Sequence, residues 1–414
     1  MNQIETKRAK MIIQKLSPVK KLLDIPKGVK VVASLVGIGF FSLGFAFSQA
    51  DENPVPRSGV SFQCSEAELN QIETEMQAYL ASLDIESSWI KKTRDVQGHT
   101  LNYTLRTATQ DASTIDLRER PEYRISMESV DMPTPAGSMA QVPTVSKKEI
   151  VLALFQHGRH TRFDKQFCSA RSFRDHVGIR QNTVLWSQKL QWGWPDGEPA
   201  YWNPKFWSRG TPHKNVALTE AFMDAFHNQS LYGIGCYTAT KIVMVQAILD
   251  YYNRVSPDAQ KLSQVVKNLM VDGEPLVDIE PPWSGDPAFD YQANRKPGKI
   301  LSHVFQIAPL NFIPGDWIYM VNTHMGSKDK TGYEGSNAIY LGGGRFDDYY
   351  NDNNHSYTYR EKLDEVYQWE NGVFSRTHHA DKIKPVSEED FRRFGLHPSQ
   401  GGYVLDIRMS HSLM

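Results

Sequence analysis

The sequence predicts an α+β fold in which a central helix packs against an antiparallel sheet. In the C-terminal third, short apolar segments alternate with turns, at 302–308, 317–322, 337–343 and 345–350, as expected of consecutive strands. Helical patterns precede these strands and do not alternate with them, which argues against a parallel βαβ arrangement. The segment 236–252 is apolar around most of its circumference, as is typical of a helix at the centre of a domain.

The first 50 residues have the pattern of an export signal. Eight basic and two acidic residues occupy the first 30 positions, and an uncharged apolar run at 31–47 follows them. This run ends in Ser48-Gln49-Ala50, with small residues at the two positions that a signal peptidase recognises. It also reaches the lower length limit for crossing a bilayer, so residues 1–50 fit either a cleaved signal peptide or an uncleaved signal anchor. We expect an exported protein, periplasmic or secreted, with membrane contact only through residues 31–50 if they are retained.

Composition limits the partners of the remaining chain. The chain is 40% hydrophobic and 22% charged, which is typical of a globular protein. Its formal charge is −1, and without the first 50 residues, which carry +6, it becomes −7. An acidic body of this kind argues against nucleic acid as the main partner.

Two parts are expected after the export segment, with a boundary near residue 145. A polar loop with several prolines, 132–143, separates an N-terminal segment of unknown role, 51–145, from a C-terminal domain, 146–414. The first part is expected to begin with a linker at 52–59 and to contain two strands within 100–130. The stretch 180–212 is dense in Trp, Pro and Gly and is expected to fold as packed loops. Capping boxes predict two helix starts, at Ser65 with Glu68 and at Ser146 with Glu149.

Cys236 is the main candidate for chemistry. It follows Gly233-Ile234-Gly235 and begins the apolar helix, so its sulfur should lie beside the unpaired N–H groups of the first turn. That environment lowers the pKa of a thiol and favours the nucleophilic thiolate. The alternative is that Cys236 is an inert, buried small side chain.

Three further segments, LYGIGCYTATKIVMVQAILDYY, PGDWIYMVN and YEGSNAIYLGGGRF, occur in that order. Together they resemble the bacterial spore-coat transglutaminase family of protein-glutamine γ-glutamyltransferases. In that family the nucleophilic cysteine begins an Ala/Thr/Ile-rich helix, and a later Gly-x-Asn strand bears an acidic partner. The corresponding elements here are 216–252, 315–322 and 335–342, with a looser match near 361–363, and the resemblance covers roughly 180–410. It implies a transglutaminase-like, papain-like core with Cys236 as nucleophile.

The assisting residues depart from the family pattern. The family's acid directly precedes the Asn of the strand motif, and this position is Ser336 here. Glu334 lies two residues before Ser336 and on the same face of the expected strand, so we assign the assisting carboxylate to Glu334. The alternative is that Glu334 is a solvated residue at the edge of a loop. The family's His position falls on Tyr349 by direct counting and on His355 after a short gap. His355 is preferred because imidazole transfers protons near neutral pH. His227, His303 and His324 are alternatives.

The resemblance implies attack of Cys236 on the side chain of a protein glutamine, release of ammonia, and transfer of the thioester to a lysine amine. The partners would be proteins with accessible Gln and Lys side chains. A cysteine peptidase or amidase, a glutamine deamidase and a non-catalytic envelope binding module remain alternatives. If Cys236 is catalytic and must stay free, the odd count of three cysteines leaves Cys64 and Cys168 as the natural disulfide pair.

No cofactor or metal is expected. The cysteines and histidines lack zinc-ligand spacing, and the Asp/Asn-rich run 347–354 lacks the spacing and the glycine of an EF-hand. That run is therefore expected to be a polar turn.

Overall fold

A computed structural model provides the structure, and it describes residues 58–106, 115–195, 197–281, 297–304, 310–347, 349–351, 356–374 and 380–413. The predicted export segment 1–50, most of the predicted linker and His355 lie outside these residues. The described residues belong to one compact unit. One hydrophobic core reaches from Phe62 near its start to Met409 near its end. The boundary expected at residue 145 stays a prediction.

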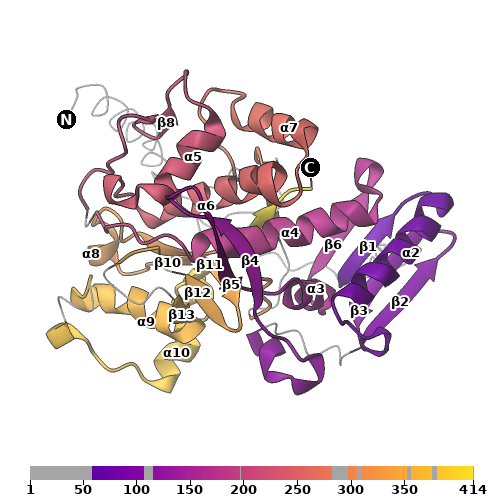
Figure 1. The fold of residues 1–414 in the computed structure, drawn as a ribbon. Coiled ribbons are helices and arrows are strands. Elements are labelled where there is room, and N and C mark those ends of the chain that lie inside the picture. Colours follow the sequence, from indigo (N-terminus) through magenta and orange to yellow (C-terminus); the bar gives the residue numbers. More distant parts are fainter. Residues whose placement is uncertain are drawn as a thin grey trace, which may run out of the picture. The chain divides into compact units, whose positions relative to one another are not determined.

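The N-terminal part forms a four-stranded sheet covered by a helix at one end of the unit (Figure 1). The strand order is β2-β3-β1-β6, and only the β1–β6 pair is parallel. The helix α2 (Glu66–Ser82) begins with the predicted capping box of Ser65 and Glu68. The strands of this sheet are β1 (Gly59–Gln63), β2 (Ile90–Asp95), β3 (Thr100–Leu105) and β6 (His160–Asp164).

A disulfide joins this sheet to the helical layer. Cys64, directly after β1, is bonded to Cys168, directly before α4 (Ala170–Ser187), and Cys236 is free. This confirms the predicted pair. The bridge closes a sequence separation of 104 residues. In the chain-entropy model, a loop of that size stabilises the folded state by about 4–5 kcal/mol.

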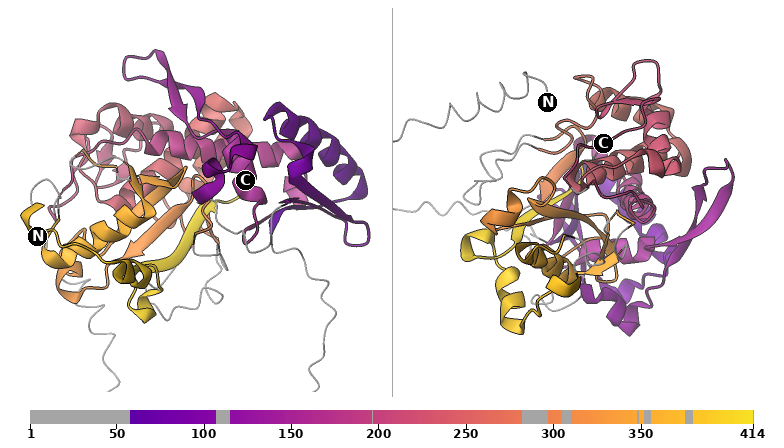
Figure 2. Two further views of the ribbon diagram at one scale, coloured as in Figure 1. Left: turned by 90° about the horizontal axis from the view of Figure 1, so that it is seen from below. Right: turned by 90° about the vertical axis from the view of Figure 1, so that its left-hand side faces the viewer.

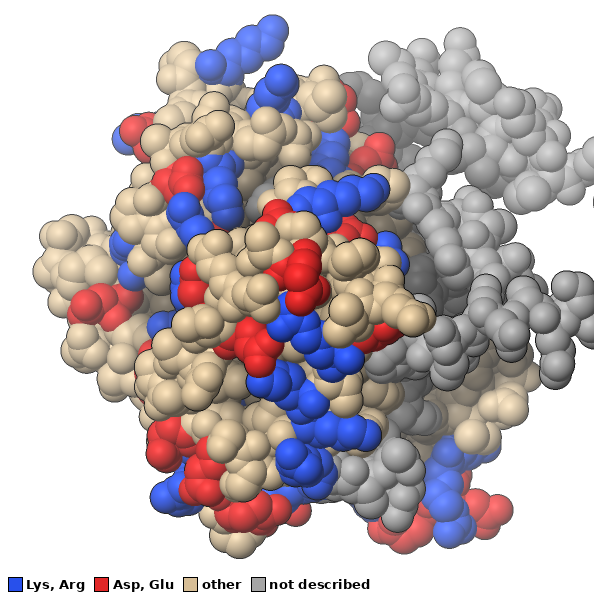
Figure 3. Space-filling view, turned by 90° about the vertical axis from the view of Figure 1, so that its right-hand side faces the viewer, with Lys and Arg blue, Asp and Glu red and all other residues tan. Residues whose placement is uncertain are grey.

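The face of the molecule drawn in Figure 3 carries interspersed acidic and basic side chains. At the N-terminal sheet, Lys92 and Arg94 of β2 form ion pairs with Glu73 and Glu66 of α2. Such exposed pairs contribute little to stability individually. Among the described residues, no helix is long and apolar enough to cross a membrane.

Residues 115–144 differ from the prediction. Instead of a second strand near 121–130, the chain forms two short 3₁₀ segments, Ile115–Glu119 and Pro121–Tyr123. Instead of a proline-bearing loop, it forms a hairpin of β4 (Glu128–Pro133) and β5 (Met139–Thr144). Proline is tolerated there because a two-stranded sheet consists of edge strands, where a missing N–H leaves no interior gap in the ladder.

Among the described residues, five α-helices lie between β5 and the first strand of the main sheet in sequence. In α6 (Cys236–Asp250), every residue from Ala239 to Asp250 is buried. The prediction of a central helix at this position is confirmed. The helices are α3 (Lys147–Phe155), α4, α5 (Leu218–His227), α6 (Cys236–Asp250) and α7 (Ala259–Leu269).

Two local predictions in this layer are corrected. The loops expected from residue 180 begin after Ser187, because α4 continues to that residue with almost all of its second half buried. The later loops include the short pair β7 (Trp207–Ser208) and β8 (Thr211–Pro212). The Ser146 side chain caps α3, but Glu149 does not close the capping box. Its carboxylate instead accepts hydrogen bonds from Arg118 and from the backbone N–H of Gly343.

The main sheet has six antiparallel strands in the order β13-β12-β11-β10-β14-β9. This confirms the predicted α+β class, and a strand lies in each of the four predicted segments, of which 305–308 and residue 348 are outside the described residues. The strands are β9 (Leu301–Val304), β10 (Trp317–Val321), β11 (Gly335–Gly342), β12 (Arg345–Asp347), β13 (Ser356–Thr358) and β14 (Val404–His411).

Helices cover both faces of this sheet (Figures 1 and 2). Trp317 and Ile339 pack in the core shared with α4 and α6, whereas their neighbours Ile318 and Ala338 pack with α9. This alternation follows from the two-residue period of a strand. Every residue of β11 is therefore buried. The helices on the second face are α9 (Tyr359–Gln368) and α10 (Glu388–Phe394), and the short α8 (Met325–Lys328) follows β10.

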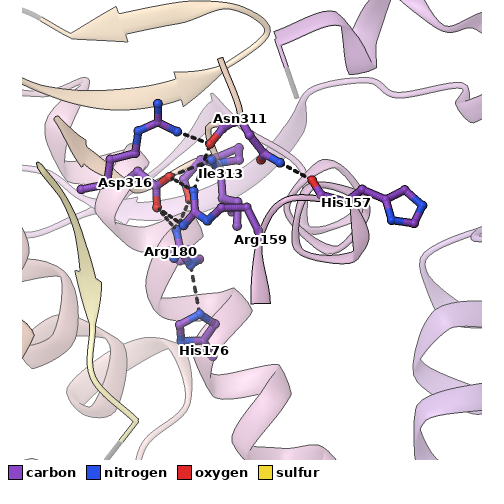
Figure 4. Close-up of polar contacts among 9 residues, drawn as sticks. His157, Arg159, His176, Arg180, Asn311, Ile313 and Asp316 are labelled. Atoms are coloured by element: carbon purple, nitrogen blue, oxygen red, sulfur yellow. Dashed lines mark hydrogen bonds and ion pairs between the residues drawn. The ribbon is translucent and has the colours of Figure 1, made fainter. Parts of the chain in front are cut away.

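A buried ionic cluster fixes the start of β10 against α4 (Figure 4). The carboxylate of Asp316 accepts two hydrogen bonds from Arg159, at 2.6 and 3.1 Å, and one from Arg180 at 3.0 Å. The two guanidinium groups hold the pKa of Asp316 well below its usual range despite burial. Gly315, with φ +83°, lies so close to Arg180 that an added Cβ would be 3.1 Å from its Cα. The cluster thereby sets the position of the sheet relative to the helix layer.

Candidate active site around Cys236

Cys236 is the first residue of α6, as the sequence predicts. Gly235 is the N-cap residue in an extended conformation, and it has no side chain to cap the first turn. The N–H groups at the start of a helix lack intrahelical partners. They form the positive end of the helix dipole, which favours a developing negative charge. The half-buried thiol of Cys236 therefore lies beside donors suited to an oxyanion.

Two groups of β11 contact the sulfur. The Sγ atom donates to the carbonyl oxygen of Gly335 at 3.6 Å and accepts from Nδ2 of Asn337 at 3.5 Å. The indole N–H of Trp317 donates to Oδ1 of Asn337 at 3.0 Å, which orients the amide so that its NH₂ group points at the sulfur. Asn337 and Trp317 both lie in the sequence motifs, but their roles at the sulfur become visible only in the structure.

The pKa of Cys236 is raised, whereas the sequence predicts that it is lowered. Burial raises the pKa of the thiol, because a thiolate would lose hydration there, and the hydrogen bond from Asn337 lowers it by less. The helix terminus, which is readable from the sequence, favours a lowered pKa. The enclosure of the sulfur by the sheet, which is not readable from the sequence, has the opposite effect. The neutral thiol is therefore the resting form.

Cys236 lines a narrow cavity beside the part of β11 that extends beyond the neighbouring strand β12. β12 pairs with β11 only near Tyr340–Gly342, so groups from both faces of the sheet meet beside Gly335–Asn337. The cavity is small, with a volume of about 30 Å³ open to water-sized molecules. It is lined by Trp194, Cys236, Gly332, Tyr333, Ser336, Asn337, Tyr350, Glu365, Trp369 and Phe374. Trp194, from the Trp-rich stretch 180–212, is among these residues.

Glu365 is the carboxylate among the lining residues. It lies on α9, on the opposite side of the sheet from α6, and its side chain is 14% exposed. Lys362, one turn earlier and 2% exposed, forms an ion pair with it at 2.8 Å. Sequence reasoning missed both residues. The sequence pattern that could have revealed them is their position on the same buried helix face as Leu363 and Val366, because charged residues are rare on such a face.

A family model described as protein-glutamine γ-glutamyltransferase matches residues 131–355, more than half of the chain. The chain belongs to the protein-glutamine γ-glutamyltransferase family. This confirms the family indicated by the sequence motifs.

Two individual relatives have been identified. A protein-glutamine γ-glutamyltransferase of Bacillus mycoides (strain KBAB4) is 25% identical over 150 residues, which are 35% of this chain and 44% of that protein. The chain thus spans less than half of this relative. A solved transglutaminase from Geobacillus stearothermophilus, without its C-terminal extension, is 18% identical, with 59% of this chain and 94% of that chain covered and a TM-score of 0.36.

The matched γ-glutamyltransferase segment includes Cys236 and Glu334 but ends before Glu365. Glu334 is exposed, and its carboxylate accepts a hydrogen bond from the backbone N–H of Gly332 at 2.9 Å. It does not belong to the set of residues that line the cavity. Ser336, at the family's acid position, does line it. The assignment of Glu334 as the assisting acid stays a prediction.

The histidine candidates are not brought to the sulfur among the described residues. His355 lies outside them, so its assignment also stays a prediction. His227, His303 and His324 are absent from the set that lines the cavity. Tyr349, the ungapped alternative, lies beneath α6, where its hydroxyl bonds with that of Thr240 at 2.9 Å, and Thr240 in turn donates to the Cys236 carbonyl.

Tyr350 donates to the carbonyl of Ile234 at 2.8 Å, so both tyrosines bond near the start of α6. Nothing in the described part of the chain gathers three or more His, Cys, Asp or Glu side chains in a metal-binding geometry. Asp347, in the Asp/Asn-rich run, belongs to β12 and accepts a hydrogen bond from Ser187.

Proposed function

We propose that the protein is a protein-glutamine γ-glutamyltransferase that joins glutamine and lysine side chains of proteins by an isopeptide bond. One observation carries this proposal beyond family membership: the Cys236 thiol lies at an uncapped helix N-terminus, receives a hydrogen bond from Asn337, and faces a cavity with aromatic walls. This placement of a helix-terminal cysteine against an antiparallel sheet supports a transglutaminase-like, papain-like core.

In the first half-reaction, Sγ of Cys236 attacks the γ-carboxamide carbon of a glutamine. The C–S bond forms, the C–N bond breaks, and the thiol proton leaves with the amide nitrogen as ammonia. The N–H groups at the start of α6 and the NH₂ group of Asn337 stabilise the oxyanion of the tetrahedral intermediate. Because the resting thiol is neutral, proton transfer accompanies the attack. Glu334 and His355 remain the sequence-based candidates for assisting it.

In the second half-reaction, a lysine amine attacks the thioester and regenerates the thiol. Water competes for the same thioester, so transfer requires that the cavity restrict its access. The rings of Trp194, Tyr333 and Trp369 support such a role because they line the cavity next to the sulfur. Hydrolysis instead of transfer would make the protein a glutamine deamidase.

Export is part of the proposal. The basic and apolar pattern of residues 1–50 is the first support, and the Cys64–Cys168 disulfide, which persists in oxidising compartments, is the second. The substrates would then be proteins of the envelope or outside the cell.

The test is incorporation of a fluorescent primary amine into a glutamine-rich protein, with ammonia release measured in parallel. Cys236→Ala is expected to reduce both by about 10⁴-fold or more, because the nucleophile is lost, while thermal unfolding stays near that of the wild type. Ammonia release by the wild type without amine incorporation would identify a deamidase. Retention of incorporation by the Cys236→Ala variant would rule out the proposed mechanism.

A further inference from the structure

We propose that Glu365 and the aromatic rings beside it form the site for the acceptor ammonium, and that Glu365 takes the proton that this ammonium must lose. The inference rests on the proposed function. It assigns a residue of the second half-reaction that lies beyond the segment matched by the family.

The position of Glu365 is the first support. Glu365 lines the same cavity as Cys236 and acts electrostatically on its thiol, although the two residues come from helices on opposite faces of the sheet. Lys362 holds it by an ion pair that is almost fully enclosed. A buried ion pair contributes little to net stability, because desolvation of both charges offsets their attraction. Stability alone therefore does not account for a charged pair at this place.

The aromatic wall of the cavity is the second support, because two of its rings contact the ammonium of Lys330, a residue outside the lining set. The ring of Tyr333 is surrounded by those of Trp194, Trp369 and Phe374, with centroid distances of 5.5, 5.2 and 4.4 Å. The Nζ atom of Lys330 lies 4.6 Å from the centroid of Tyr333 and 3.9 Å from that of Phe374. Aromatic faces attract cations through their quadrupole. Rings that accept an ammonium on the chain's own lysine are suited to a lysine of a substrate.

The chemistry of the acceptor requires a base. A lysine side chain is an ammonium at neutral pH and has no lone pair with which to attack the thioester. The carboxylate of Glu365 first binds the ammonium and then receives one of its protons. The neutral amine attacks the thioester carbon, forming the C–N bond and breaking the C–S bond. The second amine proton goes to the departing sulfur, giving the thiol, and Glu365 releases its proton to water.

Ser336 is consistent with this assignment. The family's acid position lies on β11, and a serine there provides a hydroxyl in place of a charge. Glu365 supplies a carboxylate to the same cavity from α9. The base for the second half-reaction thus comes from a different element than the strand motif suggests.

The experiment compares two acceptors in the full exported chain. A fluorescent alkylamine carries an ammonium, whereas hydroxylamine is uncharged at neutral pH and attacks without losing a proton to a base first. Ammonia release and hydroxamate formation by the wild type would support the proposed function. Their absence would contradict the proposed function itself, whatever the role of Glu365. The variant Glu365→Gln is expected to lower kcat/KM for the alkylamine by about 10²-fold or more. Hydroxamate formation and ammonia release should change by no more than a few-fold.

Glu370→Gln is the matched control, since this exposed carboxylate follows α9 by two residues and is outside the set that lines the cavity. It is expected to leave both acceptors unchanged. If Glu365→Gln folds poorly by thermal unfolding, Glu365→Asp keeps the charge and should restore part of the preference for the alkylamine.

Three outcomes would overturn the inference. Equal losses with both acceptors would place Glu365 in thioester formation or in the fold. Unchanged alkylamine transfer would remove it from the reaction. A selective loss of alkylamine transfer in Glu334→Gln and not in Glu365→Gln would assign the base to the strand motif.

Discussion

At the scale of the residue, the chemistry of Cys236 depends on the balance between hydrogen bonding and burial. The helix terminus and Asn337 favour the thiolate, whereas burial against β11 disfavours it and prevails. A neutral resting thiol is also less prone to oxidation, because the thiolate is the reactive form.

The alkylation rate of Cys236 should follow from this balance. Because the pKa lies above the ordinary value of 9.0, the rate of reaction with iodoacetamide is expected to be still rising at pH 9. Asn337→Ala removes a donor to the sulfur and should move the profile to higher pH. Mass spectrometry of the Cys236 peptide at a series of pH values measures both. A rate that levels off below pH 8 would show a stabilised thiolate instead.

At the scale of the element, the start of α6 combines an exposed set of donors with a fixed position. Tyr349 and Tyr350 hold it through Thr240 and Ile234, and Gly235 leaves its first turn without a side-chain cap. Most helices use Ser, Thr, Asp or Asn at this position to satisfy these donors. Their availability here is useful for catalysis, since the oxyanion can take the place of the cap.

A substitution at Gly235 tests this role. The residue has φ −64°, and an added Cβ meets no atom within 4 Å, so side chains fit there. Gly235→Ala should retain activity, whereas Gly235→Asp should lower kcat by about 10-fold or more, because its carboxylate caps the first turn and repels the oxyanion. Thermal unfolding should be unchanged or slightly higher for Gly235→Asp. Equal activity of the two variants would show that these donors do not act in the reaction.

At the scale of the whole molecule, buried histidines near the ionic cluster make stability depend on pH. Burial lowers the pKa of His411 to about 4, and burial together with Arg180 lowers that of His176 well below its ordinary value. The unfolded chain therefore binds more protons than the folded chain between about pH 6.5 and 4. The free energy of unfolding consequently falls as the pH drops through this window.

His411 alone should account for about 3 kcal/mol of this loss, at 1.36 kcal/mol per pKa unit. Asp316 adds a loss only at lower pH, because its pKa is depressed from 3.8. Urea unfolding at pH 7.0 and 4.5 measures the difference. His411→Gln keeps a donor for the Met244 carbonyl but cannot take up a proton, so its pH dependence should be smaller. An unchanged slope in this variant would contradict the assignment.

The sequence by itself determined the α+β class, the central helix with Cys236 at its start, the strand segments of the main sheet, the Cys64–Cys168 pair and the family. These features depend on periodicity, capping, cysteine count and local motifs, which are all readable along the chain. The predicted strand near 121–130 is wrong because 3₁₀ segments occupy its first part, and the predicted loops at 132–143 and 180–187 are wrong because strand pairing and burial outweigh the local prolines and tryptophans.

Only the tertiary structure decided the chemistry around the sulfur. The raised pKa of Cys236 results from enclosure by β11, and the orientation of Asn337 results from Trp317 on the neighbouring strand. Glu365 is 129 positions from Cys236 in the chain and reaches its cavity only because β12 is too short to cover the start of β11. Burial and contacts across a sheet depend on how elements pack, and no local pattern of residues records them.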